Sequence, residues 1–126
     1  MNIPSQLRYT PQHLWIEPQA DGTVRAGITD HAQETLGDIV FVDAPAVGSL
    51  LQAGQPCGIV ESVKTASDLH APITGTVLEI NGDLQLSPEL INENPYAAWI
   101  FRIQPAAPTT SDALLDAEGY RQLLDQ

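Results

Sequence analysis

Prolines and glycines interrupt this chain along its whole length, with ten prolines and nine glycines among 126 residues. Such spacing favours many short strands joined by turns over a helical bundle, because both residues weaken helix interiors. A chain of this length can bury a core as one unit. We therefore expect one mainly β domain over residues 1–126, with a core at about 7–104 and a C-terminal helical extension at about 111–125.

The charge balance limits the partners. Sixteen acidic residues against five basic ones give a formal net charge of −11. Nucleic acid and anionic membranes would be repelled, whereas proteins with basic faces would be attracted. Simple solubility explains the same charge equally well.

We recognise no targeting signal in this sequence. The N-terminal residues lack a basic region followed by an apolar run, and the longest strongly apolar run, residues 39–42, is too short to span a bilayer. Cys57 is the only cysteine, so no internal disulfide can form. We expect a soluble protein of a prokaryotic cytoplasm that does not engage membranes.

Local patterns predict the order of the elements. Alternation and turn residues predict strands within 7–28, at 39–42, on either side of Lys64, at 76–80 and at 98–103, with a loop at 45–55. In the 98–103 strand, Trp99, Phe101 and Ile103 would share one face. Capping residues predict a two-turn helix after Thr29–Asp30 that stops at Leu36–Gly37, a short helix opened by Ser87–Pro88, and a last helix capped by Asp116.

Lys64 is the only lysine, and it falls between two short extended segments. These segments predict a hairpin whose tip, Lys64–Thr65, is exposed to solvent, where another enzyme could acylate the amine. With a two-residue tip, Glu61 would lie opposite Asp68, and facing like charges cost stability. Either the two carboxylates frame the lysine for a partner, or the register differs, or both groups are simply solvated.

Catalytic signatures are otherwise missing. The chain has no glycine-rich phosphate loop and no nucleophile elbow, and its histidines, His13, His31 and His70, lack metal-ligand spacing. We therefore expect a protein that is not itself an enzyme and holds no metal.

The sequence around Lys64, from Glu61 to Leu69, resembles the lipoylation site of the glycine cleavage system H-protein family. The resemblance extends over nearly the whole chain. Further matching segments are Tyr9–Thr10 with His13-x-Trp15, residues 27–34 and 36–42, Ala71-Pro72-Ile73-x-Gly75, Leu90-Ile91-Asn92-x-Asn94-Pro95-Tyr96 and Leu115-Asp116-Ala117-Glu118-x-Tyr120.

This resemblance implies a barrel-sandwich hybrid fold of the lipoyl/biotinyl-domain type, with short peripheral helices and a C-terminal helix. It implies lipoate in amide linkage to Lys64. Glu61 and Gly75 would serve recognition by the lipoate-attaching enzymes, Gly75 through a tight turn. His31 and Asp68 would belong to a cleft that shelters the arm.

The resemblance also implies three enzyme partners. Glycine decarboxylase (P protein) would load an aminomethyl group, the tetrahydrofolate-dependent aminomethyltransferase (T protein) would take its methylene carbon, and dihydrolipoamide dehydrogenase (L protein) would reoxidise the dithiol. The reacting groups would belong to the cofactor and these enzymes, so the chain would act as a shuttle. A shuttle of this kind is best served by a monomer.

Three positions depart from the family pattern. Leu14 stands where the family usually has a glutamate, Thr65 replaces a common alanine, and the Tyr96–Trp99 link is one residue shorter. Leu14 and the short link keep open an H-like lipoyl carrier that serves lipoate transfer or sulfur metabolism.

Other carrier types fit less well. A biotinyl carrier would have methionines at the positions of Val63 and Thr65. A lipoyl domain of a 2-oxoacid dehydrogenase would be followed by a linker and an acyltransferase domain. A purely structural interaction protein remains an alternative only if Lys64 is never modified.

Overall fold

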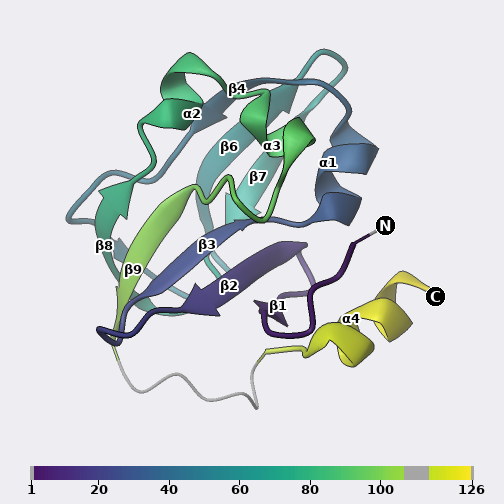
Figure 1. The fold of residues 1–126 in the computed structure, drawn as a ribbon. Coiled ribbons are helices and arrows are strands. Elements are labelled where there is room, and N and C mark those ends of the chain that lie inside the picture. The colour runs from purple at the N-terminus through teal and green to yellow at the C-terminus, as the bar shows by residue number, and fades with distance from the viewer. Residues whose placement is uncertain (1, 107–113, 126) are drawn as a thin grey trace.

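Two antiparallel sheets form the body of the protein (Figure 1). The structure is a computed structural model and describes residues 2–106 and 114–125. The larger sheet has the order β1-β2-β3-β9-β8-β5, and its strands are β1 (Arg8–Tyr9), β2 (Leu14–Pro18), β3 (Val24–Ile28), β9 (Phe101–Pro105), β8 (Gly75–Ile80) and β5 (Leu50–Leu51). The smaller sheet has the order β4-β6-β7, with β4 (Ile39–Asp43), β6 (Pro56–Ser62) and β7 (Ala66–His70). The predicted barrel-sandwich hybrid fold is confirmed.

Short helices flank the two sheets, as the sequence predicted. They are α1 (Asp30–Leu36), α2 (Asp83–Leu86), α3 (Leu90–Glu93) and α4 (Ala117–Leu124). The side chain of Thr29 accepts a hydrogen bond from the N–H of Ala32 at the start of α1, and Asp116 caps α4 in the same way. Both caps were predicted. The beginning of the predicted C-terminal extension, residues 111–113, lies outside the described residues.

Several local predictions were wrong. Ser87 does not cap α3, which begins at Leu90 after Glu89, and α2 was not predicted at all. The expected loop at 45–55 contains the two-residue strand β5, whose partners on β8 are remote in sequence. The strand expected from residue 98 begins at Phe101, and Trp99 packs in a different cluster from Phe101 and Ile103.

The inner core fills the space between the two sheets. It takes alternate residues from the strands of the larger sheet and meets buried residues of the smaller sheet, such as Val42, Val60 and Leu69. Burial of this apolar surface is the main source of stability in a fold of this kind.

A second apolar cluster covers the outer face of β1 and β2. Its buried members come from the N-terminal segment, these strands and α4: Ile3, Leu7, Tyr9, Trp15, Ala117 and Tyr120. The rings of Tyr9 and Tyr120 stack at 4.8 Å between centroids. Trp15 lies over Gly27, where an added Cβ would stand 2.8 Å from the indole ring. Strand β2 is therefore buried on both faces, which its simple alternation did not indicate.

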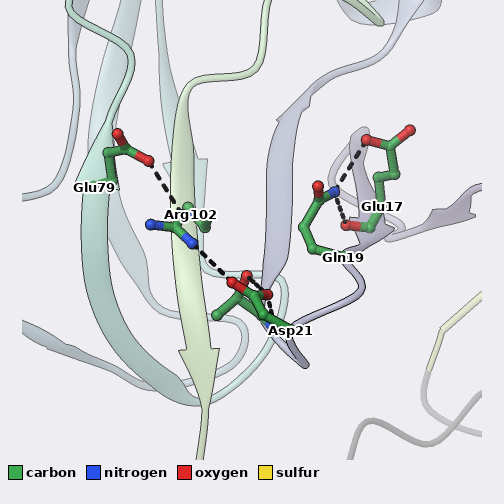
Figure 2. A network of polar contacts seen from close by, with 6 residues as sticks. Glu17, Gln19, Asp21, Glu79 and Arg102 are labelled. Atoms are coloured by element: carbon green, nitrogen blue, oxygen red, sulfur yellow. Dashed lines mark hydrogen bonds and ion pairs between the residues drawn. The ribbon is translucent and has the colours of Figure 1, made fainter.

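A small polar network holds the β2–β3 turn to the neighbouring strands (Figure 2). Arg102 on β9 contacts Asp21 at 3.2 Å and Glu79 at 3.1 Å. The side-chain and backbone hydrogen bonds from Thr23 lower the pKa of the exposed Asp21 carboxyl. Ion pairs at such exposed positions contribute little free energy, so this network orients the turn more than it stabilises the fold.

In the described part of the chain, no helix has the length and apolar character needed to cross a membrane.

Gly75 lies within the larger sheet at a point of close backbone approach. It begins β8 and pairs with Leu51 and Pro105. A Cβ at this position would stand 2.4 Å from the carbonyl oxygen of Gln104 and 2.6 Å from Ile103. The chain bends at residues 72–74, so the expected turn ends just before Gly75, which begins the next strand and whose lack of a side chain serves strand packing.

We predict that Gly75→Ala lowers the free energy of unfolding by about 2 kcal/mol, since a backbone atom must move to admit the methyl group. Urea denaturation of the purified variant measures this loss. Gly82→Ala is the matched control, because an added Cβ there meets no atom within 4 Å. Equal stability of the two variants would contradict the packing argument.

Candidate functional site

Lys64 is exposed in the connection between β6 and β7. Ser62, the last residue of β6, makes hydrogen bonds across this connection. The N–H of Ser62 donates to the carbonyl oxygen of Thr65 at 2.7 Å. The Ser62 hydroxyl oxygen accepts from the N–H of Lys64 at 3.3 Å and from the N–H of Thr65 at 3.2 Å. Ser62 is buried beneath this connection. The backbone of Lys64 is thus held from below while its side chain faces solvent.

The register of the hairpin differs from the expected one. Glu61 lies opposite Ala66, and Asp68 lies opposite Ile59. The expected pairing of Glu61 with Asp68 is wrong, because four residues, 62–65, separate the last paired residues Glu61 and Ala66, whereas a two-residue tip was expected. Glu61 and Asp68 are both exposed. The hairpin therefore places no two carboxylates directly opposite each other at these positions.

The segment between α1 and β4 supports the lysine from one side. The carbonyl oxygen of Asp38 accepts a hydrogen bond from the N–H of Val63 at 3.0 Å. Gly37 ends α1 with a φ of 84°. A Cβ on Gly37 would stand 3.4 Å from Cε of Lys64, so the methylene stem of the lysine lies beside this glycine. The sequence identified Gly37 as a helix stop, but it gave no sign of this contact.

A cleft of about 130 Å³ opens between α1, the start of β2 and the hairpin. Two predicted site residues, His31 of α1 and Asp68 of β7, both line it. The remaining lining is Gln12, His13, Leu14, Ile28, Ala32, Thr35, Leu36, Val60, Ser67 and Leu69. The cleft has an apolar floor and a rim of polar groups, which suits an apolar chain ending in a polar or charged group.

Leu14 belongs to the wall of this cleft. It pairs with Ile28 across β2 and β3, and only 1% of its surface is exposed. The residue that departs from the family pattern therefore lies beside the predicted site residues, and it makes the cleft more apolar.

The other two predicted residues lie apart from the cleft. Glu61 is on β6, directly before the Lys64 connection. Gly75 follows the far end of β7 and belongs to the other sheet. The hairpin therefore carries Lys64, Glu61 and Asp68, the cleft brings His31 together with Asp68, and Gly75 lies apart from both.

His13 and Tyr120 are site residues that the sequence analysis did not single out. The ring of His13 lies 4.6 Å from that of His31, and its Nδ1 is 2.8 Å from the hydroxyl oxygen of Tyr120. The same hydroxyl is 2.7 Å from Oγ1 of Thr29, the cap of α1. Tyr120 therefore joins both walls of the cleft to α4. The sequence signals for Tyr120 were its place in a motif near the C-terminus and on one face of the last helix, and neither indicates this contact.

Burial alters the ionisation of these groups. Burial raises the pKa of Tyr120 to about 12, so its hydroxyl keeps its proton at neutral pH. Burial, and secondly the charge of His31, lower the pKa of His13. Neutral His13 is therefore the form that suits the folded protein.

Metal and thiol chemistry find little support at this site. Among the residues that the structure describes, no group of three or more His, Cys, Asp or Glu side chains could hold a metal ion. Burial raises the pKa of the Cys57 thiol to about 11, so it is protonated and poorly nucleophilic at neutral pH.

Two packed antiparallel sheets that present an exposed lysine on a hairpin define a domain of the lipoyl/biotinyl type. The profile of the family described as "Glycine cleavage H-protein" matches residues 7–126. The chain therefore belongs to the glycine cleavage H-protein family.

Individual relatives agree with this assignment. The glycine cleavage system H protein of Methylobacillus flagellatus is 61% identical over 125 residues, which cover 98% of this chain and 99% of the relative. That of Thiobacillus denitrificans is 50% identical, with 99% and 97% covered. The crystal structure of a glycine cleavage system H protein from Mycobacterium marinum matches with a TM-score of 0.88 at 43% identity, covering 98% of this chain and 100% of that chain.

We predict that His13 makes the protein less stable as the pH falls from about 7.5 to about 5.5. Its folded pKa lies below the ordinary value near 6.5, so the unfolded chain binds the proton more readily. The stability from neutral His13 is present above that ordinary pKa and is lost as the pH falls through the folded pKa.

Urea denaturation across this pH range measures the effect. His13→Asn, which suits the observed φ of 70°, should flatten the pH dependence. His70→Asn removes a different imidazole and serves as the control. A His13→Asn protein with the unchanged pH slope would contradict this assignment.

Proposed function

We propose that the chain is a lipoylated shuttle of the glycine cleavage system, with lipoate held in amide linkage by Lys64. The observation that supports this most directly is the exposed Lys64 on a hairpin whose backbone is fixed by Ser62. The proposed partners are glycine decarboxylase, the aminomethyltransferase, dihydrolipoamide dehydrogenase and the enzymes that attach lipoate. The chain itself performs no catalysis in this role and acts as a monomer.

The residues present fit the proposed cofactor. The Lys64 amine is accessible for acylation, and the apolar floor of the neighbouring cleft suits an aliphatic chain. Bound lipoate would supply a dithiolane that accepts the aminomethyl group and later gives up two electrons as the dithiol. The side chains of this chain would hold and shelter that group, while the partner enzymes carry out the reactions.

Each of these side chains has a distinct task. Lys64 provides a flexible tether, which raises the effective concentration of the carried group at each partner. Leu14 and Leu69 exclude water from the apolar lining of the cleft. The carboxylate of Asp68 can pair with an aminomethyl ammonium group, and His31 lies at the same rim. Glu61 offers a carboxylate to basic residues of an attaching enzyme, whereas Gly75 contributes through the packing of β8.

An H-like carrier for lipoate transfer or sulfur metabolism is the second candidate, and one observation favours it. Leu14 is buried in the cleft wall where the family usually has a glutamate, so the cleft has one carboxylate fewer for a cationic amine. Loading by glycine decarboxylase distinguishes the two roles.

We expect lipoylated protein that is incubated with glycine decarboxylase and glycine to gain the mass of an aminomethyl group. Intact mass spectrometry measures this gain, and a proteolytic digest separates Lys64 from the N-terminal amine. An established H protein is the positive control. A lipoylated chain that stays unloaded beside a loaded control would favour the second candidate.

We also predict that Lys64→Arg abolishes lipoylation and changes the free energy of unfolding by less than about 0.5 kcal/mol, since the side chain is exposed. The matched variant Lys64→Arg with Arg121→Lys moves the only lysine to α4, where 57% of the Arg121 side chain is exposed. It should stay unmodified, because the lysine has left the hairpin. Modification of the moved lysine would argue against recognition of the Lys64 connection.

A further inference from the structure

Asn92 of α3 makes three hydrogen bonds to α1 and to the segment that follows it. Its Nδ2 donates to the carbonyl oxygen of Gly37 at 2.9 Å and to Oε1 of Gln33 at 3.0 Å. Its Oδ1 accepts from the N–H of Ile39 at 2.8 Å. One side-chain amide thus binds the last turn of α1, its terminal glycine and the first residue of β4.

The segment held by Asn92 is the one that supports the lysine. Asp38 lies between the two backbone groups that Asn92 binds, and its carbonyl oxygen accepts from the N–H of Val63. Gly37 lies beside the methylene stem of Lys64. Only one backbone segment therefore separates Asn92 from the Lys64 connection.

The orientation of the Asn92 amide is itself determined by its neighbours. Nε2 of Gln33 donates to Oδ1 of Asp30 at 2.8 Å, so Gln33 turns its oxygen toward Asn92. The Nδ2 of Asn92 must then face this oxygen, which leaves Oδ1 for the N–H of Ile39. An aspartate at this position could keep only the last of the three bonds.

We propose that Asn92 is a positioning residue for the modification of Lys64: it holds residues 37–39 in place and thereby fixes the backbone from which the lysine leaves the surface. This inference rests on the proposed function because it concerns lipoylation. An attaching enzyme meets a preformed connection, so less of its binding energy is spent on ordering residues 62–65. If the connection were ordered only part of the time, the apparent affinity would be the intrinsic affinity multiplied by the ordered fraction.

Asn81 provides a matched control elsewhere in the fold. Its Nδ2 donates to the carbonyl oxygen of Trp99 at 2.9 Å, and its Oδ1 accepts from the N–H of Asp83 at 3.2 Å. It is half-buried like Asn92. Asn81→Asp therefore makes the same chemical change at a hydrogen-bonded asparagine that does not bind the segment beside Lys64.

The first test is amide hydrogen exchange of the unmodified protein. We expect Asn92→Asp to speed exchange of the Val63 and Lys64 amides about tenfold, because local opening becomes easier when two hydrogen bonds are lost. Gln33→Leu removes one of the three bonds and should shift the same amides less. Asn81→Asp should leave these amides at the native rate. Unchanged exchange in Asn92→Asp, or an equal change in Asn81→Asp, would overturn the proposal.

The second test is the kinetics of lipoate attachment with the apo protein as substrate. Asn92→Asp should raise KM several-fold and leave kcat nearly unchanged, since the chemistry at the amine is the same once the connection is ordered. A fall in kcat without a change in KM would overturn the positioning role. If the native chain also accepts no lipoate, the proposed function fails, while the exchange experiment still decides the role of Asn92.

Discussion

At β1 and β2 the larger sheet buries side chains on both of its faces, and the position of the site depends on this constraint. Leu14 and Ile16 face the inner core, whereas Trp15 between them is covered by the second cluster. The cover comes partly from α4, whose Tyr120 reaches His13 and Thr29. The same helix that seals the outer face therefore holds two walls of the cleft together.

The smaller sheet anchors the backbone on both sides of Lys64. Strand β6 pairs with both β4 and β7, so the backbone on either side of the Lys64 connection is held in antiparallel ladders. Figure 1 shows that the loop joining β6 and β7 projects from the body at a distance from α4. The lysine side chain is exposed above this hydrogen-bonded backbone, and a tether works best when its anchor does not move.

Charge is distributed unequally between the two sheets. The arginines lie on β1, β3, β9 and α4, at Arg8, Arg25, Arg102 and Arg121. The strands of the smaller sheet contain acidic residues such as Asp43, Glu61 and Asp68 and no arginine. Acylation of Lys64 would remove the remaining positive charge from this hairpin. A partner with a basic face would then be steered toward the carried group and not toward the opposite sheet.

Several signals that act within a few residues were read correctly from the sequence, although the cap predicted at Ser87 was not. The caps Thr29 and Asp116, the stop at Gly37 and the exposed lysine between two strands depend on neighbouring residues alone. The hairpin register was missed because Ser62 closes a longer connection than the pattern of Lys64 and Thr65 indicated. The Tyr120 contact to His13 joins residues 107 positions apart, and no local pattern reports it.

Gly37 illustrates why the candidate site could be only partly predicted. Its φ of 84° identifies a helix end, and this requirement is visible in the sequence as a glycine after an amphipathic turn. Its contacts with Lys64 and Asn92 require three separate segments to meet. The glycine that ends a helix also leaves room for the lysine stem, so one residue meets a local demand and a tertiary one. A residue with a sufficient local reason can therefore also make tertiary contacts that no local pattern reports.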